Sequence, residues 1–401
     1  MAWEAVMESV QSVAIAGAGL GGLTAAACLL EAGFHVTVYE QAPALGEVGA
    51  GIQISANGSS VLHALGLRED LERIGVKPMS YDFHLFDSAE RLQGFDLGVD
   101  HEQRFGSCYY QFHRADLHAV LVQAVQSRRS DAIELNKTCV GYDESDSCVR
   151  LKFADGSDAK ADLLIGADGI KSAVREQLVG VQNPVFTGQA AWRIIVPADR
   201  LPSGFMEQRM YVWVGPGKHA VTYYLRGGEL VNLVGCVDSD WNEEGWTIKA
   251  SWDELKADYQ GWCDTIQRIL DAADKDACYR WALNNRPALD TWHSQRVVML
   301  GDAVHSTLPY MAQGAVMAIE DAAVLTRVLE SDEPLPDALA RYQRNRLPRT
   351  TRIVNESTSN AKLFHHESEQ ALRDAFARRG DIGRDRANWL YSYKPLSVEL
   401  D

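Results

Sequence analysis

The chain has 401 residues, of which 46% are hydrophobic and 23% are charged, and its formal net charge is −16. This length favours two domains over a single core, and the composition is typical of a soluble globular protein. The acidic balance argues against nucleic-acid binding, and no apolar run approaches the roughly 20 residues that a membrane helix needs. Residues 1–12 lack the basic and apolar parts of a signal peptide, and the seven cysteines are scattered without a metal-binding spacing. We therefore expect a cytoplasmic protein with free thiols and no metal site.

The first 40 residues predict a β-α-β unit. Residues 12–17 form a short apolar strand pattern, residues 20–32 carry apolar side chains at helical spacing, and residues 35–40 return to a strand pattern. Such a unit is expected to have parallel strands and a right-handed crossover. The chain then predicts, in order, a glycine-rich loop over residues 46–58, a helix over residues 114–128 and a meander of three short strands from about residue 137 to 167.

The middle of the chain has a different character, because alternating strand patterns dominate it. These patterns predict a mostly antiparallel sheet and cover residues 190–196, 210–214, 220–226 and 230–237. Two short helical patterns follow, at residues 251–259 and 262–272. After them come a buried-strand pattern at residues 297–300, helices to about residue 358 and a polar C-terminal stretch without a clear pattern. The first domain is therefore expected to draw on both ends of the chain, with a second domain inserted between them.

The first chemical signal is the motif GAGLGG, which lies between the first strand and the first helix. Gly17 permits a tight turn, Gly19 lets a pyrophosphate approach the backbone, and Gly22 lets helix and strand pack closely. The helix that begins at Leu20 points its positive end at the phosphates. Glu40 ends the second strand, where a carboxylate can accept hydrogen bonds from ribose hydroxyls and repels a 2′-phosphate. The motif predicts a bound FAD or NAD rather than NADP; the alternative is a glycine-rich structural turn.

Two aspartates at strand ends favour FAD over NAD. Asp168 follows the apolar run DLLIGA, and Asp302 follows the run VVMLG; each aspartate precedes a helical pattern. Two such acidic acceptors are more than one nicotinamide dinucleotide needs, whereas the ribitol chain of FAD carries hydroxyls of its own. The alternative for either aspartate alone is a helix N-cap, a position that aspartate fills well.

These motifs taken together, GAGLGG with Glu40, then GADG, then GDAVH followed by MAQGA and IEDA, resemble the single-component flavoprotein aromatic hydroxylases. These are class A FAD-dependent monooxygenases of the p-hydroxybenzoate hydroxylase fold, and the chain looks most similar to the salicylate hydroxylase, 3-hydroxybenzoate 6-hydroxylase and 6-hydroxynicotinate 3-monooxygenase branch. The resemblance covers about residues 10 to 350. It implies an α/β fold with a Rossmann-like FAD-binding domain, an inserted mostly antiparallel β-sheet substrate domain and C-terminal helices. The expected boundaries are residues 10–80, 105–180 and 291–360 for the FAD-binding domain, 81–104 and 181–290 for the substrate domain, and 361–401 for a C-terminal segment.

The resemblance also implies which residues hold the cofactor. The glycines of GAGLGG and Glu40 would hold the ADP half of FAD, and Arg114 would reach the phosphate and ribitol region. Asp168 matches an aspartate that touches FAD and takes part in handling NAD(P)H. Asp302 matches the aspartate that binds the ribitol hydroxyls. The alternative for Arg114 is a surface arginine at a helix start.

Two further segments are expected beside the flavin. Gly51, in the glycine-rich loop, is assigned to the cofactor, and Pro309 is expected to form a rigid wall beside the flavin ring. The backbone N–H groups of Gly314 and Ala315 are expected to face the flavin oxygen O2, where the N-terminal end of a helix stabilises negative charge.

The implied reaction is the hydroxylation of an aromatic ring. NADH or NADPH reduces FAD, O2 adds to give a flavin C4a-hydroperoxide, and an electron-rich ring attacks the distal oxygen. His219 and Tyr223 lie four residues apart on a strand pattern, hence on one face, and match a histidine and a tyrosine that line the substrate site in similar proteins. Together with Gln53 and Tyr310 they are the candidate catalytic residues, with His219 as the base or hydrogen-bond partner of a phenol. The alternatives are a surface histidine at a strand start and a tyrosine of the core.

Some residues limit what the resemblance implies. The 6-hydroxynicotinate enzymes show histidines where this chain has Gln53 and Tyr310, so a hydroxybenzoate fits better. His305 is expected to be structural rather than a proton carrier. Arg193 could meet a substrate carboxylate, but an arginine at a sheet edge is the more common case.

Other functions stay open at this point. They include a flavin halogenase, a plain FAD reductase, an oxidoreductase of the 6-hydroxynicotinate or urate type, and a flavoprotein sensor without catalysis. The halogenase motif WxWxIP is not matched by YVWVGP at residues 211–216. The expected partner is a small aromatic acid, with no nucleic acid and no membrane, and the protein is expected to be a monomer or a homodimer.

Overall fold

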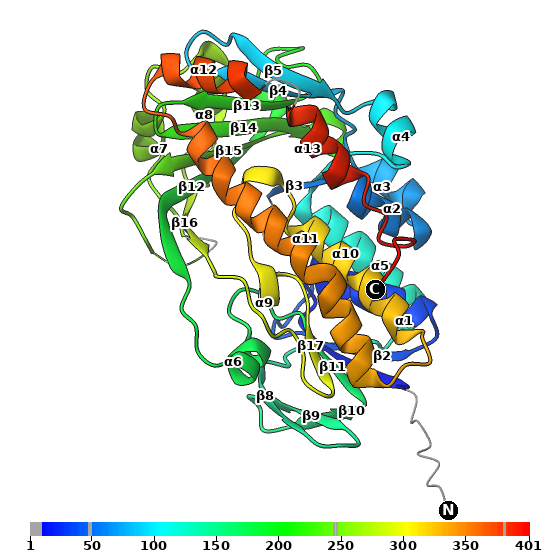
Figure 1. Cartoon of the computed structure of the whole chain (residues 1–401). Helices are drawn as coiled ribbons and strands as arrows, with labels where there is room; N and C mark the ends of the chain where they lie inside the picture. The colour runs from blue at the N-terminus through cyan, green and yellow to red at the C-terminus, as the bar shows by residue number, and fades with distance from the viewer. Residues whose placement is uncertain (1–9, 47–49, 244, 246–247, 380–381) are drawn as a thin grey trace, which may run out of the picture.

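A parallel sheet forms the lower half of the molecule, as the β-α-β pattern predicts (Figure 1). In the computed structural model, the described residues are 10–46, 50–243, 245, 248–379 and 382–401. The sheet has the spatial order β17-β11-β1-β2-β7, with the bounds Val297–Met299, Leu163–Gly166, Ser12–Ala16, His35–Tyr39 and Ile133–Glu134. All of its neighbouring strands are parallel. The central strands β1, β11 and β17 are almost entirely apolar and buried because other elements cover both faces of the sheet, whereas β2 and β7 carry polar residues toward one edge.

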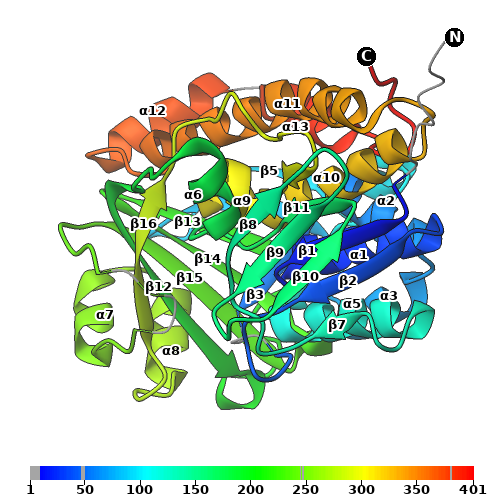
Figure 2. The ribbon, with the colours of Figure 1, turned by 90° about the horizontal axis from the view of Figure 1, so that it is seen from below.

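The cover on each face of this sheet differs. Helix α1 (Leu20–Glu31) packs against α5 (Arg114–Arg128) and α10 (Gly314–Leu329), and their apolar side chains join the strands in one core. A separate antiparallel sheet, in the order β10-β9-β8, lies in front of the parallel sheet in Figure 2. Its strands are Asp158–Ala161, Val149–Phe153 and Cys139–Glu144.

The upper half of the molecule is built on a seven-stranded sheet (Figure 1). Its spatial order is β16-β12-β15-β14-β13-β4-β5, with the bounds Tyr279–Asn285, Val185–Pro197, Leu230–Asp238, Lys218–Leu225, Met210–Gly215, Ser80–Leu85 and Arg91–Asp96. Every neighbouring pair is antiparallel except β13 with β4. Helices α7 (Trp252–Asp258) and α8 (Asp264–Ala272) cover one face of the sheet through a core that includes Leu255 and Ile266.

A long helix, α11 (Leu335–Phe364), crosses both halves diagonally (Figure 1). Tyr342, near its start, belongs to the core of the parallel sheet, whereas Phe364, at its end, belongs to the core on the other face of the seven-stranded sheet. Helix α12 (Glu369–Arg379) adds Leu372 and Phe376 to that second core. Helix α13 (Ile382–Tyr391) follows and packs near α2.

Shorter elements connect the halves. A two-stranded sheet pairs β3 (Gly51–Ile54) with β6 (Tyr110–His113) in antiparallel register. The remaining helices are α2 (Ala56–Ala64), α3 (Arg68–Ile74), α4 (Val99–Phe105), α6 (Ala173–Val179) and α9 (Asp302–His305), with 3-10 turns η1 (Ala198–Arg200), η2 (Arg226–Gly228) and η3 (Pro309–Met311).

The expected fold class is confirmed, but two local predictions were wrong, and the C-terminal stretch, where the sequence shows no clear pattern, contains helices. The expected loop over residues 46–58 contains strand β3 and the start of α2, because Gly51–Ile54 finds a partner in β6 far along the chain. The third strand of the expected meander is two strands: β10 pairs with β9, and β11 joins the parallel sheet. The last helices run on past residue 358, and the polar C-terminal stretch contains α12 and α13. Residues 1–9 and 47–49, on which part of the signal-peptide and loop predictions rest, lie outside the described residues.

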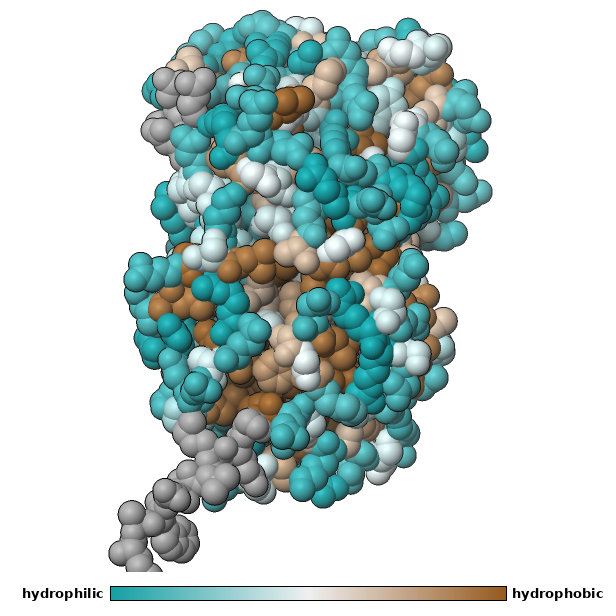
Figure 3. Space-filling view, turned by 90° about the vertical axis from the view of Figure 1, so that its right-hand side faces the viewer, coloured by the Kyte–Doolittle hydropathy of each residue, from teal (hydrophilic) through white to brown (hydrophobic). Residues whose placement is uncertain are grey.

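The surface is mainly hydrophilic on the face that carries α1 to α5. Figure 3 shows apolar residues across the middle of this face, between the upper and the lower half, and further apolar residues within the lower half. In the part of the chain that the structure describes, no helix is long and apolar enough to cross a membrane.

Candidate active site

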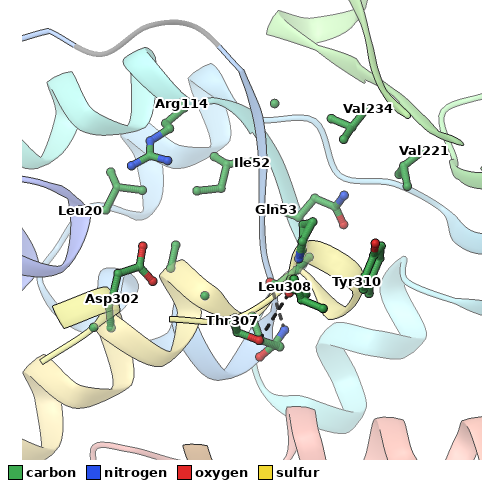
Figure 4. A pocket seen from close by; sticks show the side chains of 18 of the residues that line it. Leu20, Ile52, Gln53, Arg114, Val221, Val234, Asp302, Thr307, Leu308 and Tyr310 are labelled. Carbon is green, nitrogen blue, oxygen red and sulfur yellow. Dashed lines mark hydrogen bonds between the residues drawn. The ribbon is translucent and has the colours of Figure 1, made fainter. Parts of the chain in front are cut away.

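One cavity of about 340 Å³ lies between the two halves and joins the motifs singled out from the sequence. One end is formed by the glycine-rich turn before α1, and the other end by the inner face of the seven-stranded sheet. Figure 4 shows Arg114 and Asp302 on one side of this space and Gln53, Val221 and Tyr310 on the other. The cavity therefore has a polar, main-chain end and an aromatic end.

The glycine-rich turn has the geometry that the motif requires. Gly17 has a φ of +103°, and a Cβ there would lie 2.5 Å from the carbonyl oxygen of Ala167. A Cβ on Gly22 would lie 2.1 Å from the carbonyl oxygen of Gly17, so the helix can approach the strand only without a side chain. A Cβ on Gly19 would meet nothing within 4 Å, and Gly19 and Leu20 line the cavity. The turn thus offers open backbone to a phosphate at the positive end of α1.

Glu40 lies against the glycine-rich turn, directly after β2. Its carboxylate accepts hydrogen bonds from the backbone N–H of Ala18 (2.8 Å) and of Ala42 (2.9 Å). Each bond uses a different carboxylate oxygen, and a carboxylate offers about four acceptor positions, so capacity for ribose hydroxyls remains. Glu40 itself does not line the cavity, so the cavity ends at the glycine-rich turn and does not reach this carboxylate.

Arg114 and Asp302 bring opposite charges to the polar end of the cavity. Arg114 is the first residue of α5 and follows β6, whereas Asp302 is the first residue of α9 and follows β17. The N-cap of α9 is Gly301, so Asp302 does not cap this helix and its exposed carboxylate faces the cavity. The pair fits a group that presents both phosphate oxygens and hydroxyls.

Asp168 has a mixed role. One carboxylate oxygen accepts from the backbone N–H of Val174 (3.2 Å) in the first turn of α6, whereas Ser172 is the N-cap of that helix. The other oxygen is buried without a hydrogen-bond partner among the described residues, and burial raises the pKa of this carboxyl. Its neighbours Ala167 and Gly169 line the cavity, although Asp168 itself does not. Asp168 therefore contacts the start of helix α6, as the helix-cap alternative predicts, through one carboxylate oxygen only.

The segment from Pro309 to Ala315 forms the floor of the cavity. Pro309, Gly314 and Ala315 all line it, and Pro309 is exposed to that space. Helix α10 begins at Gly314, with Gln313 as its N-cap residue, so its unsatisfied backbone N–H groups lie at the cavity. Such an end suits a partly negative group of a bound ring system.

A buried ionic network holds α10 in this position and explains the motif IEDA. Glu320 accepts from Arg346 (2.7 Å) and Arg349 (2.7 Å), and Asp321 accepts from Arg346 (2.7 Å). Asp321 is also 2.5 Å from the Nε2 of His305. The network ties α10 to α11 and α9. His305 therefore has the structural contact expected of it and does not line the cavity.

The aromatic end brings together residues from segments that are distant in sequence. His219, Val221 and Tyr223 project from β14 on one face and line the cavity, as the alternation predicts. Gln53 comes from β3, and its amide oxygen accepts from the hydroxyl of Tyr109 (2.6 Å). The hydroxyl of Tyr223 lies beside Gly51, where a Cβ would come within 2.4 Å of it. A side chain at position 51 would therefore collide with Tyr223, which explains the glycine at the aromatic end. This steric role is separate from the expected place of Gly51 beside the cofactor.

His219 and Tyr310 are connected to residues that the sequence did not indicate. The Nδ1 of His219 lies 2.7 Å from the Nε2 of His365, the residue that follows α11. The hydroxyl of Tyr310 donates to the amide oxygen of Gln189 (2.5 Å). Burial lowers the pKa of the His219 imidazole well below its usual value and raises that of the Tyr310 phenol. No spacing in the sequence could have brought His365 to His219, because 145 residues separate them along the chain.

Arg193 contradicts its expected place at a sheet edge. It lies on β12, between β16 and β15, and is buried. Its guanidinium stacks over the rings of Tyr279 (5.7 Å) and Trp281 (5.3 Å). Burial lowers its pKa, and the positive charge of Arg114 lowers it further. Arg193 does not line the cavity. Of the described residues that do, Arg114 and Asp302 are the ones with charged side chains.

Comparisons with known proteins agree with this arrangement. The family described as FAD binding domain matches residues 10–357. A 3-amino-4-hydroxybenzoate 2-monooxygenase of Streptomyces platensis is 36% identical over 390 residues, which cover 96% of this chain and 97% of that protein. A 6-hydroxynicotinate 3-monooxygenase of Bordetella bronchiseptica is 36% identical over 367 residues, covering 90% and 94%. The structure of HpxO of Klebsiella pneumoniae with FAD and uric acid has a TM-score of 0.83 at 26% identity, covering 95% of this chain and 96% of that one.

The residues present fit FAD. The open turn at Gly19, the charged pair Arg114 and Asp302, and the start of α10 at Gly314 all line one cavity. They offer it open backbone for a pyrophosphate, charged partners for phosphate oxygens and ribitol hydroxyls, and a helix end for the ring of FAD. The family match over residues 10–357 and the similar fold of an enzyme solved with FAD agree with a bound FAD. The chain belongs to the FAD-binding domain family and is a flavoprotein monooxygenase of the class A aromatic hydroxylases.

Proposed function

We propose that this enzyme hydroxylates a small phenolic carboxylic acid with one atom of O2, at the expense of NADH or NADPH. The observation that carries the proposal is the junction of the two ends of the cavity: a site that fits FAD opens directly onto His219, Tyr223, Gln53 and Tyr310. A ring of the size of a hydroxybenzoate would lie between these side chains and the floor at Pro309. Bound FAD supplies the reduction by NAD(P)H and the activation of O2, which side chains cannot perform.

The residues of the chain would bind the substrate, orient it and remove a proton. His219 would accept the proton of the phenol, because its buried imidazole stays neutral and its Nε2 is the nitrogen that His365 does not use. Tyr223, on the same face of β14 as His219, and Gln53, on β3, would orient the ring by hydrogen bonds. Among the described residues at the aromatic end of the cavity there is no lysine or arginine, so we propose that hydrogen bonds hold the substrate carboxylate there.

The cofactor roles of the remaining residues are part of the same proposal. Gly17, Gly19, Leu20, Gly22 and Glu40 would hold the ADP half of FAD. Arg114, Asp168 and Asp302 would contact its phosphate and ribitol region, with Asp302 on the ribitol hydroxyls. Gly51, Pro309, Gly314 and Ala315 would surround the ring. The proposed domain boundaries are those expected from the sequence, with residues 361–401 as a C-terminal segment, of which Phe364 lines the cavity.

The test is a panel of aromatic acids offered to the FAD-loaded enzyme. The panel contains 3-amino-4-hydroxybenzoate, 3-hydroxybenzoate, salicylate and 6-hydroxynicotinate, and urate is added as a non-carboxylate ring. We expect at least one hydroxybenzoate to stimulate NAD(P)H oxidation and to yield a product that carries one ¹⁸O from ¹⁸O2 by mass spectrometry. Failure of all phenolic acids to do so would disprove the proposal; NAD(P)H oxidation with hydrogen peroxide as the sole product would mark the compound as an effector.

A second candidate is 6-hydroxynicotinate, which the Bordetella bronchiseptica relative is named for. The similarity along 90% of the chain favours it, whereas Gln53 and Tyr310 stand at the two positions where the resemblance implies histidines. The same panel separates the two candidates by the acid with the higher kcat/KM.

We further propose that the enzyme works in the cytoplasm, as a monomer or a homodimer. All seven cysteines are free in the structure, which suits a reducing compartment. Fractionation of the producing cells and light scattering of the purified protein test the two statements.

A further inference from the structure

Behind His219, a row of hydrogen bonds leads from the cavity to the protein surface. The Nδ1 of His219 lies 2.7 Å from the Nε2 of His365, and the Nδ1 of His365 lies 2.7 Å from the Oδ1 of Asp238. The side chain of His219 is buried, that of His365 is 3% exposed, and that of Asp238 is 52% exposed. Three titratable groups are therefore connected in a line from a closed site to solvent.

The carboxylate at the outer end fixes the proton positions along the row. A nitrogen 2.7 Å from a carboxylate oxygen must donate, so the Nδ1 of His365 carries a proton. In a neutral His365 the Nε2 is then the acceptor, and the Nδ1 of His219 must donate to it. That tautomer leaves a lone pair on the Nε2 of His219, the nitrogen available to a ligand in the cavity. The row is thus set to accept a proton at its inner end.

Neighbouring groups support this arrangement. The amide of Gln189 donates to the same oxygen of Asp238 (2.9 Å), and its own oxygen accepts from Tyr310. The amide nitrogen also lies 3.0 Å from the Nδ1 of His365. Because an ionised carboxylate oxygen can only accept, it takes hydrogen bonds from both nitrogens, and the Nδ1 of His365 keeps its proton. Burial alone would raise the pKa of Asp238, but hydrogen bonds from His365 and Gln189 lower it below its usual value. Among the described residues, the other titratable groups beside the row are Cys236 on β15, Lys218 on β14, Tyr310, whose ring packs on both histidines, and Tyr259, whose hydroxyl donates to the carbonyl oxygen of His219. Within the described residues no group of histidine, cysteine and acidic side chains is arranged to hold a metal ion, so the cluster is not a metal site.

His219 needs such an outlet. Its imidazole is buried between the rings of Tyr310 and Phe364, and no carboxylate contacts it directly. Burial lowers its pKa well below the usual value, so a proton taken from a phenol cannot remain on it. The only titratable side chain in hydrogen-bond contact with its ring, within the described residues, is His365.

We propose that His365 and Asp238 form a proton relay that carries the phenol proton from His219 to solvent. The O–H bond of the phenol breaks as the Nε2–H bond of His219 forms; the Nδ1 proton of His219 passes to the Nε2 of His365, and the Nδ1 proton of His365 passes to Asp238 and then to water. No oxidation state changes, and one proton leaves the site for each phenol that becomes a phenolate. Both imidazoles are left in their other tautomer, and a proton that returns along the same row to the phenolate product restores the first. His365 and Asp238 act through His219 and are positioning residues, and the inference rests on the proposed function.

The test follows the proton itself in the FAD-loaded enzyme. Each phenolic acid of the panel that the wild type hydroxylates is mixed with the enzyme in a stopped-flow instrument. Ultraviolet difference absorbance reports the phenolate, and a pH indicator in weak buffer reports the released proton. The variants are His365→Gln and Asp238→Asn. The asparagine can still accept from the Nδ1 of His365 but cannot take its proton, so it preserves the geometry and removes the outlet.

We expect both variants to retain FAD and to form phenolate about tenfold more slowly or less than the wild type, with Kd changed by less than about threefold. The matched control is His366→Gln, the next histidine in the chain, which should behave as the wild type. A second ligand separates transport of the proton from a structural defect. A nitro analogue such as 4-hydroxy-3-nitrobenzoate has an ionised phenol at neutral pH, so it should bind to all variants at the rate of the wild type.

Wild-type rates of phenolate formation and proton release in both variants would overturn the relay, as would an equal slowing of the phenolic acid and its pre-ionised analogue. If the wild-type enzyme hydroxylates none of the phenolic acids, the proposed function has failed, and the relay fails with it. The two failures are distinguished because the first is seen in an active wild type and the second in an inactive one.

Discussion

The two ends of the cavity are built in different ways. At the cofactor end, the main chain makes the site: a glycine turn, two helix starts and a proline determine where a ligand can lie. At the aromatic end, side chains make it, and they come from β3, β14, η3 and the end of α11. The cofactor end therefore depends on local geometry that few residues can adopt. The aromatic end depends on which distant segments meet, and it can change its substrate without changing the fold.

The largest effect is expected at the cofactor end from Gly17→Ala. The new Cβ would lie 2.5 Å from the carbonyl oxygen of Ala167, at a φ of +103°. We expect loss of bound flavin and a free energy of unfolding lowered by about 2 to 4 kcal/mol. Flavin absorbance and urea unfolding measure both. In the control, Gly19→Ala, the same methyl group meets nothing within 4 Å, so only FAD affinity should fall. Equal unfolding midpoints for the two variants would contradict the steric explanation.

The next effect is expected at the aromatic end from His219→Gln. The variant should keep FAD and lose the coupled hydroxylation rate by about 100-fold or more, because it lacks a group that can accept the phenol proton. Product formation is compared with NAD(P)H oxidation under saturating substrate. Unchanged coupling would show that the base lies elsewhere.

A smaller effect is expected from Asp302→Ala, which should weaken FAD binding and leave stability unchanged. The carboxylate is exposed to the cavity, so stability should hold, while FAD affinity should fall by about 10- to 100-fold with the loss of charge-assisted hydrogen bonds. Titration of the apoprotein with FAD gives the Kd. Asp332→Ala, another exposed aspartate that does not line the cavity, serves as the control. The assignment of Asp302 would be wrong if both variants bound FAD as the wild type does.

Tyr223→Phe should lower kcat/KM by about tenfold, the value of one orienting hydrogen bond, with FAD retained. The matched control is Tyr224→Phe, because Tyr224 lies on the opposite face of β14 and packs with the other core. Steady-state kinetics on both variants compare the two faces of one strand. If kcat/KM fell in Tyr224→Phe but not in Tyr223→Phe, the face of β14 that carries Tyr224, and not the one that carries Tyr223, would contact the substrate.

The smallest effect is on stability against pH. The pKa of His219 is lowered by burial, so below about pH 6.5 the unfolded chain binds a proton that the folded chain does not. Its contribution is therefore complete above the unfolded pKa and is lost as pH falls, by about 0.7 kcal/mol between pH 7 and pH 6. Urea unfolding at both pH values should show a loss that is larger in the wild type than in His219→Gln by about this amount. An identical loss in both proteins would mean that His219 is protonated in the folded state. Burial lowers the pKa of His101 to about 4, so this histidine adds a loss of the same sign to both proteins.

The sequence predicted most of the cofactor end, and the reasons are local. The turn at Gly17, the strand ends before Asp168 and Asp302 and the helix after Gly314 each follow from residues that are adjacent in the chain. It also predicted that His219 and Tyr223 share a face, because side chains alternate along a strand. What it missed, such as the pairing of β3 with β6 and the buried place of Arg193, depends on a partner strand from elsewhere in the chain.

The sequence by itself determined the cofactor motifs and the fold class, because glycine turns and strand-end acids carry their geometry within a few residues. Only the tertiary structure decided what surrounds the substrate end. The 30-residue helix α11 starts on the parallel sheet and delivers His365 to the far sheet, where β15 brings Asp238 and β12 brings Gln189. No pattern in the chain marks His365, because contacts between residues so far apart in sequence are set by how the helices and sheets pack.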